Sequence, residues 1–131
     1  KGGAEPGRLL RRQQGRCWAS HRDAGGPSAR GPLPDPGSFL ARYERAVGRR
    51  PGIIVGKPST LIIGPLLAKY GPEEMVMVGD RLYTDKVMAE NAGMDFILVL
   101  SGESRREDLR KLERQPALVL EDLGELAGRA G

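Results

Sequence analysis

Short apolar runs alternate with helix-like segments from Leu33 to the end of this 131-residue chain. The runs are three to five residues long and largely aliphatic, which is typical of strands buried on both faces of a sheet. Between them, Ser38 and Asp122 are candidate helix caps, and Gly48 and Gly93 are candidate helix ends. The expected strands are 53–55, 75–78, 96–100 and 117–120, and the expected helices are 39–47, a stretch within 60–70, 84–91, 104–114 and one after Asp122.

This alternation predicts an α/β fold with three layers and a parallel sheet. Right-handed crossovers bring the carboxyl ends of all its strands to one edge, where open sheets of this kind bind ligands. The polar residues that follow the apolar runs are therefore the candidates for function. Within the second helical segment, Pro65 is expected to kink the helix or delay its start.

The first 32 residues differ from the rest in composition. They are rich in Gly, Arg and Pro and hold seven basic and two acidic residues, whereas the remainder has fourteen basic and fifteen acidic ones. Such a segment cannot bury enough apolar surface to offset its ordering entropy, so we expect a disordered basic tail over 1–32 and a domain over 33–131. Its composition also raises the hypothesis that the tail is non-native.

The overall net charge of +4 belongs to this tail, so the near-neutral body argues against nucleic-acid binding. A basic arm that binds RNA or DNA stays as an alternative, although Trp18 is the only aromatic residue among its charges. The single cysteine, Cys17, excludes an intramolecular disulfide and favours a reducing compartment. The single histidine, His21, leaves no basis for a zinc site or a Ser-His-Asp triad.

The apolar runs are far shorter than the roughly 20 residues that a membrane-spanning helix needs. The N-terminal residues are charged but are not followed by an apolar stretch, so we expect no secretory signal. Together with the single cysteine, these features predict a cytoplasmic protein that does not cross a membrane.

Three charged residues follow strand ends in a pattern that suits phosphate chemistry. Lys57 comes after Gly56 at the end of the 53–55 run, and Asp80 comes after the 75–78 run. Four residues separate Asp80 from Asp85, which lies at the start of a helix, where the helix dipole favours an anion. The lysine can neutralise a phosphate, and two converging carboxylates make a site for a hard cation such as Mg²⁺.

Each of these residues also has an ordinary interpretation. Lys57 alone could be a solvated loop lysine, Asp80 an Asx-turn residue and Asp85 a helix cap. A P-loop is excluded because Pro51 and Pro58 occupy its first glycine and its hydroxyl position. A receiver-type phosphoacceptor domain has its carboxylates before its lysine, which is the reverse of the order here.

A colinear series of motifs over residues 33–127 resembles the haloacid dehalogenase (HAD) superfamily, and within it the NagD-like, nitrophenylphosphatase-type subclass. The fold that this resemblance implies is a Rossmann-like core, of which the chain would be the C-terminal half. The matching segments are PDPGSF at 34–39, GRRP at 48–51, GKPS at 56–59, VGDRLYTD at 78–85, AGM at 92–94, VLSGE at 99–103 and REDL at 106–109.

The resemblance implies a Mg²⁺-dependent phosphatase that acts on small phosphorylated metabolites. By this analogy Lys57 is a catalytic residue that steadies the phosphoryl group, and Lys57 and Ser59 bind phosphate. Asp80 would bind Mg²⁺, and Asp85 would support the surroundings of the metal without binding it directly. Residues 33–50 would join a substrate-capping domain to the core.

The sequence also departs from the family pattern. The family nucleophile lies in an Asp-x-Asp motif, and no Asp-x-Asp occurs in this chain. We therefore expect a truncated chain that is inactive by itself, since nothing would attack the phosphoryl group. Lys86 stands where an apolar residue is more usual and would partly neutralise the metal site.

In the family, the strand that carries the nucleophile pairs beside the strand expected at 75–78. Without it, that strand would expose an apolar edge, so self-association is expected. The alternative function is a non-catalytic interaction module that docks on a partner supplying the missing strands.

Overall fold

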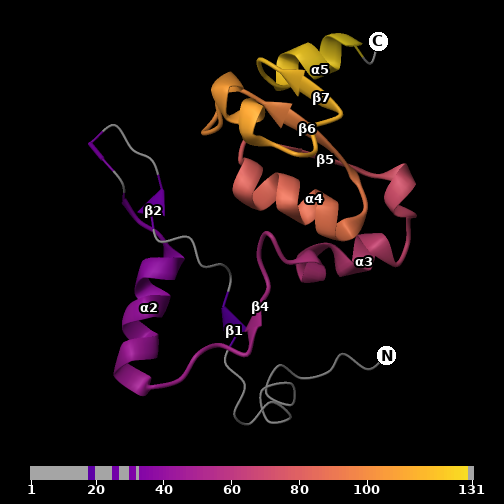
Figure 1. Ribbon diagram of the computed structural model, residues 1–131. Coiled ribbons are helices and arrows are strands. Elements are labelled where there is room, and N and C mark those ends of the chain that lie inside the picture. Colours follow the sequence, from indigo (N-terminus) through magenta and orange to yellow (C-terminus); the bar gives the residue numbers. More distant parts are fainter. Residues whose placement is uncertain (1–17, 20–24, 27–29, 32, 130–131) are drawn as a thin grey trace. The chain divides into compact units, whose positions relative to one another are not determined.

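The computed structural model describes residues 18–19, 25–26, 30–31 and 33–129 (Figure 1). It forms two compact units, Lys1–Val55 and Gly56–Gly131. Most of the tail expected over 1–32 lies outside the described residues, as does residue 32 itself, so the tail and the boundary after it stay predictions.

The first unit contains two small pairs of strands and one helix. Strand β1 (Trp18–Ala19) pairs in parallel with β4 (Ile53–Ile54), and β2 (Gly25–Gly26) pairs antiparallel with β3 (Leu33–Pro34). Helix α2 (Pro36–Val47) follows β3 and ends at Gly48, whose φ of 68° provides the left-handed turn predicted there.

Helix α2 begins earlier than the sequence predicts, so Ser38 is not its N-cap. The cap is Asp35, and Pro36 occupies the first turn, where a missing N–H costs little. The Ser38 N–H instead donates to the Asp35 carbonyl at 2.8 Å.

The second unit is built on a three-stranded parallel sheet in the order β5-β6-β7. Its strands are β5 (Val76–Gly79), β6 (Asp95–Val99) and β7 (Leu118–Leu120), and Val78, Ile97 and Leu118 lie in register across them. Its helices are the 3-10 helices Thr60–Ile63, Pro72–Glu74 and Arg106–Lys111, the π-helical turn Leu82–Lys86, and the α-helices α3 (Gly64–Leu67), α4 (Val87–Ala92) and α5 (Leu123–Arg129).

Alternate residues of the sheet form two separate apolar cores. On one face, Phe96 and Leu98 pack with Ala89 of α4. On the other face, Ile97, Val99 and Leu120 pack with Leu126 of α5. Helices α4 and α5 therefore cover opposite faces of the sheet (Figure 1), which confirms the predicted three-layer α/β arrangement.

The helices are shorter and more varied than the sequence predicts. Pro65 lies in the first turn of α3, after a separate 3-10 helix, so the delayed start expected from it is confirmed. The α-helix expected over 104–114 is wrong, because Arg106–Lys111 is a 3-10 helix. There the Asp108 carboxylate accepts from the Arg105 N–H, and the Gln115 side chain donates to the Leu109 and Leu112 carbonyls, so side chains satisfy backbone groups at both ends of this short helix.

Helix α5 has the cap that the sequence predicts, since Asp122 Oδ1 accepts from the Glu125 N–H at 3.1 Å. The pKa of Glu125 lies below its ordinary value because its carboxylate accepts a hydrogen bond from the Glu121 N–H and pairs with Arg129. Nowhere in the described ranges is a helix long and apolar enough to cross a membrane.

Candidate functional site

Lys57 and Asp85 form an ion pair in the second unit. Lys57 Nζ lies 2.5 Å from Asp85 Oδ1, and Asp85 Oδ2 accepts a hydrogen bond from the Arg81 N–H at 3.1 Å. The Asp85 side chain is 1% exposed and that of Lys57 is 44% exposed. The ammonium thus compensates a buried carboxylate from the solvent side, where it can also meet an incoming anion.

The backbone around Lys57 is fixed by two hydrogen bonds. The Ser59 N–H donates to the Gly56 carbonyl at 3.0 Å, which closes a turn around Lys57 and the cis bond that joins it to Pro58. From the neighbouring helical segment, Asn91 Nδ2 donates to the Pro58 carbonyl at 3.1 Å. Lys57 therefore extends from a loop that is tied to the helix after Asp85.

Asp85 lies in the π-helical turn, which Asp80 and Arg81 separate from the end of β5. The Lys86 N–H donates to the Arg81 carbonyl at 3.3 Å, five residues back, and the Asp85 N–H donates to the same carbonyl at 2.9 Å. Such turns are rare and are frequent at functional sites. A side chain at Gly79 would collide with the Asp85 carboxylate, so Asp85 packs directly on the end of β5, next to Asp80.

Asp80 is held by the loop that follows β6. Its Oδ2 accepts from the Glu103 N–H at 2.9 Å, and its carbonyl accepts from the Ser104 N–H at 3.0 Å. A side chain at Gly102 would collide with the Asp80 carboxylate, so glycine is required for this close approach. Within the part of the chain that the structure describes, no hydrogen bond or ion pair involves Asp80 Oδ1.

The structure thus brings together three of the sequence-predicted site residues at the carboxyl edge of the sheet. We call Lys57, Asp80 and Asp85 the carboxyl-edge site. The fourth, Ser59, begins the next helix, where its Oγ accepts from the Leu61 N–H at 3.3 Å. Its predicted contact with phosphate stays a prediction.

Sequence reasoning missed the side chains that surround Asp80. Glu103 Oε2 lies 2.7 Å from Arg81 Nε, and Glu103 Oε1 accepts from the Tyr83 hydroxyl at 2.8 Å. The position of Glu103 just past the β6 run was the available signal, because the carboxyl ends of parallel strands share an edge. For Asn91, which lies on a helix, the sequence offered no signal.

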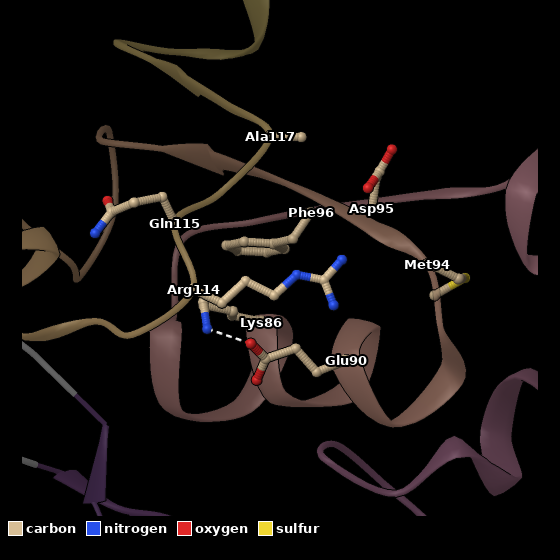
Figure 2. Close-up of a pocket in the computed structure, with 8 residues that line it drawn as sticks. All are labelled: Lys86, Glu90, Met94, Asp95, Phe96, Arg114, Gln115 and Ala117. Carbon is tan, nitrogen blue, oxygen red and sulfur yellow. Dashed lines mark hydrogen bonds and ion pairs between the residues drawn. The ribbon is translucent and has the colours of Figure 1, made fainter.

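Lys86 does not compensate the charge of the carboxyl-edge site. Its side chain is buried and pairs with Glu90, one helical turn further along. Figure 2 shows the pair beside Arg114 and Phe96, where these residues line a small cavity of about 70 Å³. The expectation that Lys86 partly neutralises the metal site is therefore corrected, because its ammonium pairs with the Glu90 carboxylate instead.

The donor set of the site fits Mg²⁺ through one direct ligand. Among the residues that can be described, no group of three or more His, Cys, Asp or Glu side chains is suited to a metal. Asp80 Oδ1 is available to a cation, whereas Asp85 Oδ2 accepts from the Arg81 N–H and the buried Asp85 Oδ1 pairs with the Lys57 ammonium without accepting a hydrogen bond. Mg²⁺ usually takes one or two carboxylates, and phosphate and water complete its shell.

Fold and site together define an α/β protein with a lysine and two carboxylates at the carboxyl edge of a parallel sheet. Residues 54–126 match the HAD-hydrolase-like family, so the chain belongs to that family, and the resemblance seen in its motifs is confirmed. Its relatives belong to the NagD-like, nitrophenylphosphatase-type subclass that the sequence predicts.

Three similar proteins illustrate this assignment to a family and subclass. Ribonucleotide monophosphatase NagD of Escherichia coli K12 is 39% identical over 99 residues, which are 74% of this chain and 39% of NagD. Dihydroxyacetone phosphatase of Corynebacterium glutamicum is 36% identical over 114 residues, which are 86% of this chain and 41% of that protein. The crystal structure of 4-nitrophenylphosphatase from Thermotoga maritima is 47% identical with a TM-score of 0.76 and covers 92% of this chain and 46% of its own. The chain thus spans less than half the length of each of them.

Proposed function

We propose that the carboxyl-edge site is the metal- and phosphate-handling part of a HAD-type phosphatase for small phosphorylated metabolites. The observation that carries this proposal is the Lys57–Asp85 ion pair, which is packed against the strand end that precedes Asp80. The names of the three relatives support it, since they are a ribonucleotide monophosphatase, a dihydroxyacetone phosphatase and a 4-nitrophenylphosphatase.

In this proposal each residue has a distinct role. Lys57 neutralises the phosphoryl group with its half-exposed ammonium, and Ser59 contributes to phosphate binding. Asp80 binds Mg²⁺ through Oδ1, while Asp85 keeps Lys57 in place. When bound, Mg²⁺ would neutralise charge on the phosphoryl oxygens.

The chain contains no Asp-x-Asp motif to supply the family's nucleophile. Its own residues can therefore bind and orient a phosphate monoester but offer no carboxylate of that motif to attack it. We propose that the 131-residue chain binds metal and phosphate and does not hydrolyse phosphate esters by itself.

Metal binding tests the proposed site directly, with Mn²⁺ as the probe for Mg²⁺. Calorimetric titration of the chain is expected to give one Mn²⁺ site, and Asp80→Asn should weaken it by at least about tenfold, because its direct ligand is changed. Asp95→Asn is the matched control, since this exposed aspartate begins β6 and lies at the amino ends of the strands, away from the carboxyl-edge site. Equal affinity in all three proteins, or no binding in any, would contradict the proposed site.

Phosphate release from para-nitrophenyl phosphate with Mg²⁺ tests the second part of the proposal. We expect no release above a protein-free blank. Robust Mg²⁺-dependent turnover that is lost in Asp80→Ala would show that this chain alone is an active phosphatase.

A second candidate function is a non-catalytic module that docks on a partner. The observation in its favour is β5, which lies at one edge of the sheet, is paired on one side only in the described residues, and leaves Val76 half exposed. Co-purification with a chain that contains an Asp-x-Asp segment would support this function. Capture of no such chain, together with metal binding by the isolated protein, would favour the first proposal.

We also propose a cytoplasmic location. The support is the single cysteine of the chain, which suits a reducing compartment. Fractionation of cells that express a tagged chain would check it.

A further inference from the structure

Glu103 connects the two loops that leave the carboxyl ends of β5 and β6. Its side chain lies on the loop after β6, and both of its carboxylate oxygens contact the loop after β5. One oxygen pairs with Arg81 at 2.7 Å and the other accepts from the Tyr83 hydroxyl at 2.8 Å. We call Glu103, Arg81 and Tyr83 the Glu103 bridge.

The backbone beside this bridge holds Asp80. The N–H of Glu103 itself donates to Asp80 Oδ2, and the N–H of Ser104 donates to the Asp80 carbonyl. Ser104 Oγ in turn accepts from the Leu82 N–H at 3.2 Å. The side chain and the main chain of Glu103 thus act on the same pair of loops.

We infer that Glu103 is a positioning residue for Asp80. The bridge fixes the Glu103 N–H at one oxygen of the Asp80 carboxylate, and this contact would leave the other oxygen, Oδ1, to bind a cation. The inference rests on the proposed function, because it assigns the purpose of the bridge to metal binding at Asp80.

The surroundings of the bridge separate it from an ordinary surface ion pair. The Arg81 and Glu103 side chains are 24% and 32% exposed, whereas those of Arg106 and Glu121, an ion pair elsewhere in the unit, are 61% and 67% exposed. Partial burial reduces solvent screening, and the additional Tyr83 hydrogen bond restricts the rotamer of Glu103. Arg81 also compensates the Glu103 charge, so the effect on the metal is one of geometry.

The experiment compares Mn²⁺ affinity in the wild-type chain and in four variants. Glu103→Ala should weaken binding about tenfold, the low end of the range for residues that orient a metal ligand. Glu103→Gln keeps one acceptor oxygen and should give a smaller loss, and Tyr83→Phe should weaken binding without any change in charge. Glu121→Gln removes the exposed ion pair and should bind like the wild type.

Amide hydrogen exchange in the metal-free chain gives a readout that does not depend on metal. The Leu82 and Ser104 amides should exchange faster in Glu103→Ala than in the wild type or Glu121→Gln, since both donate across the two loops. Unchanged exchange, or faster exchange with unchanged Mn²⁺ affinity, would overturn the inference. Failure of the wild-type chain to bind Mn²⁺ would overturn the proposed function, and amide exchange would still decide whether Glu103 holds the loops.

Discussion

The two aspartates of the carboxyl-edge site have the same side chain but different surroundings. Asp85 is buried, and its charge is compensated by Lys57 and by the Arg81 N–H. Asp80 is only partly buried, and one of its oxygens accepts from the Glu103 N–H. A buried carboxylate without such partners would be costly, so Asp85 is suited to holding Lys57 and Asp80 to binding a cation.

Gly102→Ala tests how closely the Asp80 carboxylate approaches the neighbouring loop. The new methyl group would collide with that carboxylate, so Asp80 must turn and its contact with the Glu103 N–H should weaken. We expect Mn²⁺ affinity to fall about tenfold, as for other changes that misorient a ligand. Calorimetric titration of the folded variant measures this.

Gly128→Ala is the control for that substitution, because a methyl group there meets nothing within 4 Å. It lies in α5 and should leave Mn²⁺ affinity unchanged while stabilising the helix by about 0.5–1 kcal/mol. Unchanged metal affinity in Gly102→Ala would show that Asp80 is not constrained as described.

Among the secondary-structure elements, the parallel strands were the most predictable from sequence. The runs expected at 75–78, 96–100 and 117–120 lie within one residue of β5, β6 and β7. Strands buried on both faces are continuously apolar, so this signal is local. The helices depended more on individual side chains: the 3-10 helix that stands in place of the one expected over 104–114 is closed by hydrogen bonds of Asp108 and Gln115, which periodicity does not reveal.

The candidate site also combines features that the local sequence predicts with features that only the structure shows. Asp80 follows β5 at the carboxyl edge of the sheet, as its place in the sequence predicts. The strand before Lys57, β4, pairs with β1 in the first unit, and Lys57 is placed instead by its ion pair with Asp85. The contacts that orient them are not local: the hydrogen bond from Glu103 to Asp80 joins residues 23 positions apart, and that from Asn91 joins residues 33 apart. Sequence periodicity does not reveal such contacts: the position of Glu103 after the β6 run indicated only its place at the edge, and Asn91 gave no signal at all.

Asn91→Ala tests the link between the helix and the Lys57 loop. Loss of its hydrogen bond to the Pro58 carbonyl should lower the free energy of unfolding by about 1 kcal/mol. It should also let Lys57 move, and affinity for inorganic phosphate should fall about fivefold, if a similar free energy is lost there. Thermal unfolding and phosphate titration in the presence of Mn²⁺ measure the two effects.

Gln115→Ala provides the comparison, since Gln115 also donates its side-chain amide to main-chain carbonyls, those of Leu109 and Leu112. It should lose similar stability and keep its phosphate affinity. Equal phosphate affinity in both variants would mean that Asn91 contributes to stability alone.

For the whole molecule, the exposed side of β5 is the feature most prone to pair with another chain. Within the described residues the sheet ends at β5, and a groove beside it is lined by Leu66, Tyr70 and Val76, among others. Parallel sheets are normally covered on both faces and protected at their edges. We therefore propose that the chain self-associates or is marginally stable.

Val76→Lys should reduce this self-association, because a lysine on an edge strand opposes pairing with another chain. Sedimentation velocity over a range of concentrations is expected to show association in the wild type and less in the variant. Leu123→Lys, at a similarly exposed apolar position on α5, should associate like the wild type. A wild-type chain that is a monodisperse monomer and unfolds cooperatively would contradict the proposal.

In the proposed site Asp80, beside the Lys57–Asp85 pair, binds the metal at the carboxyl edge of the sheet. Paramagnetic broadening of backbone amide signals by substoichiometric Mn²⁺ tests it most directly, because broadening falls steeply with distance from the ion. We expect broadening concentrated in residues 79–86 and 101–104, and its loss in Asp80→Asn. Broadening centred on Asp95 and Glu90 instead, or unchanged by the substitution, would contradict it.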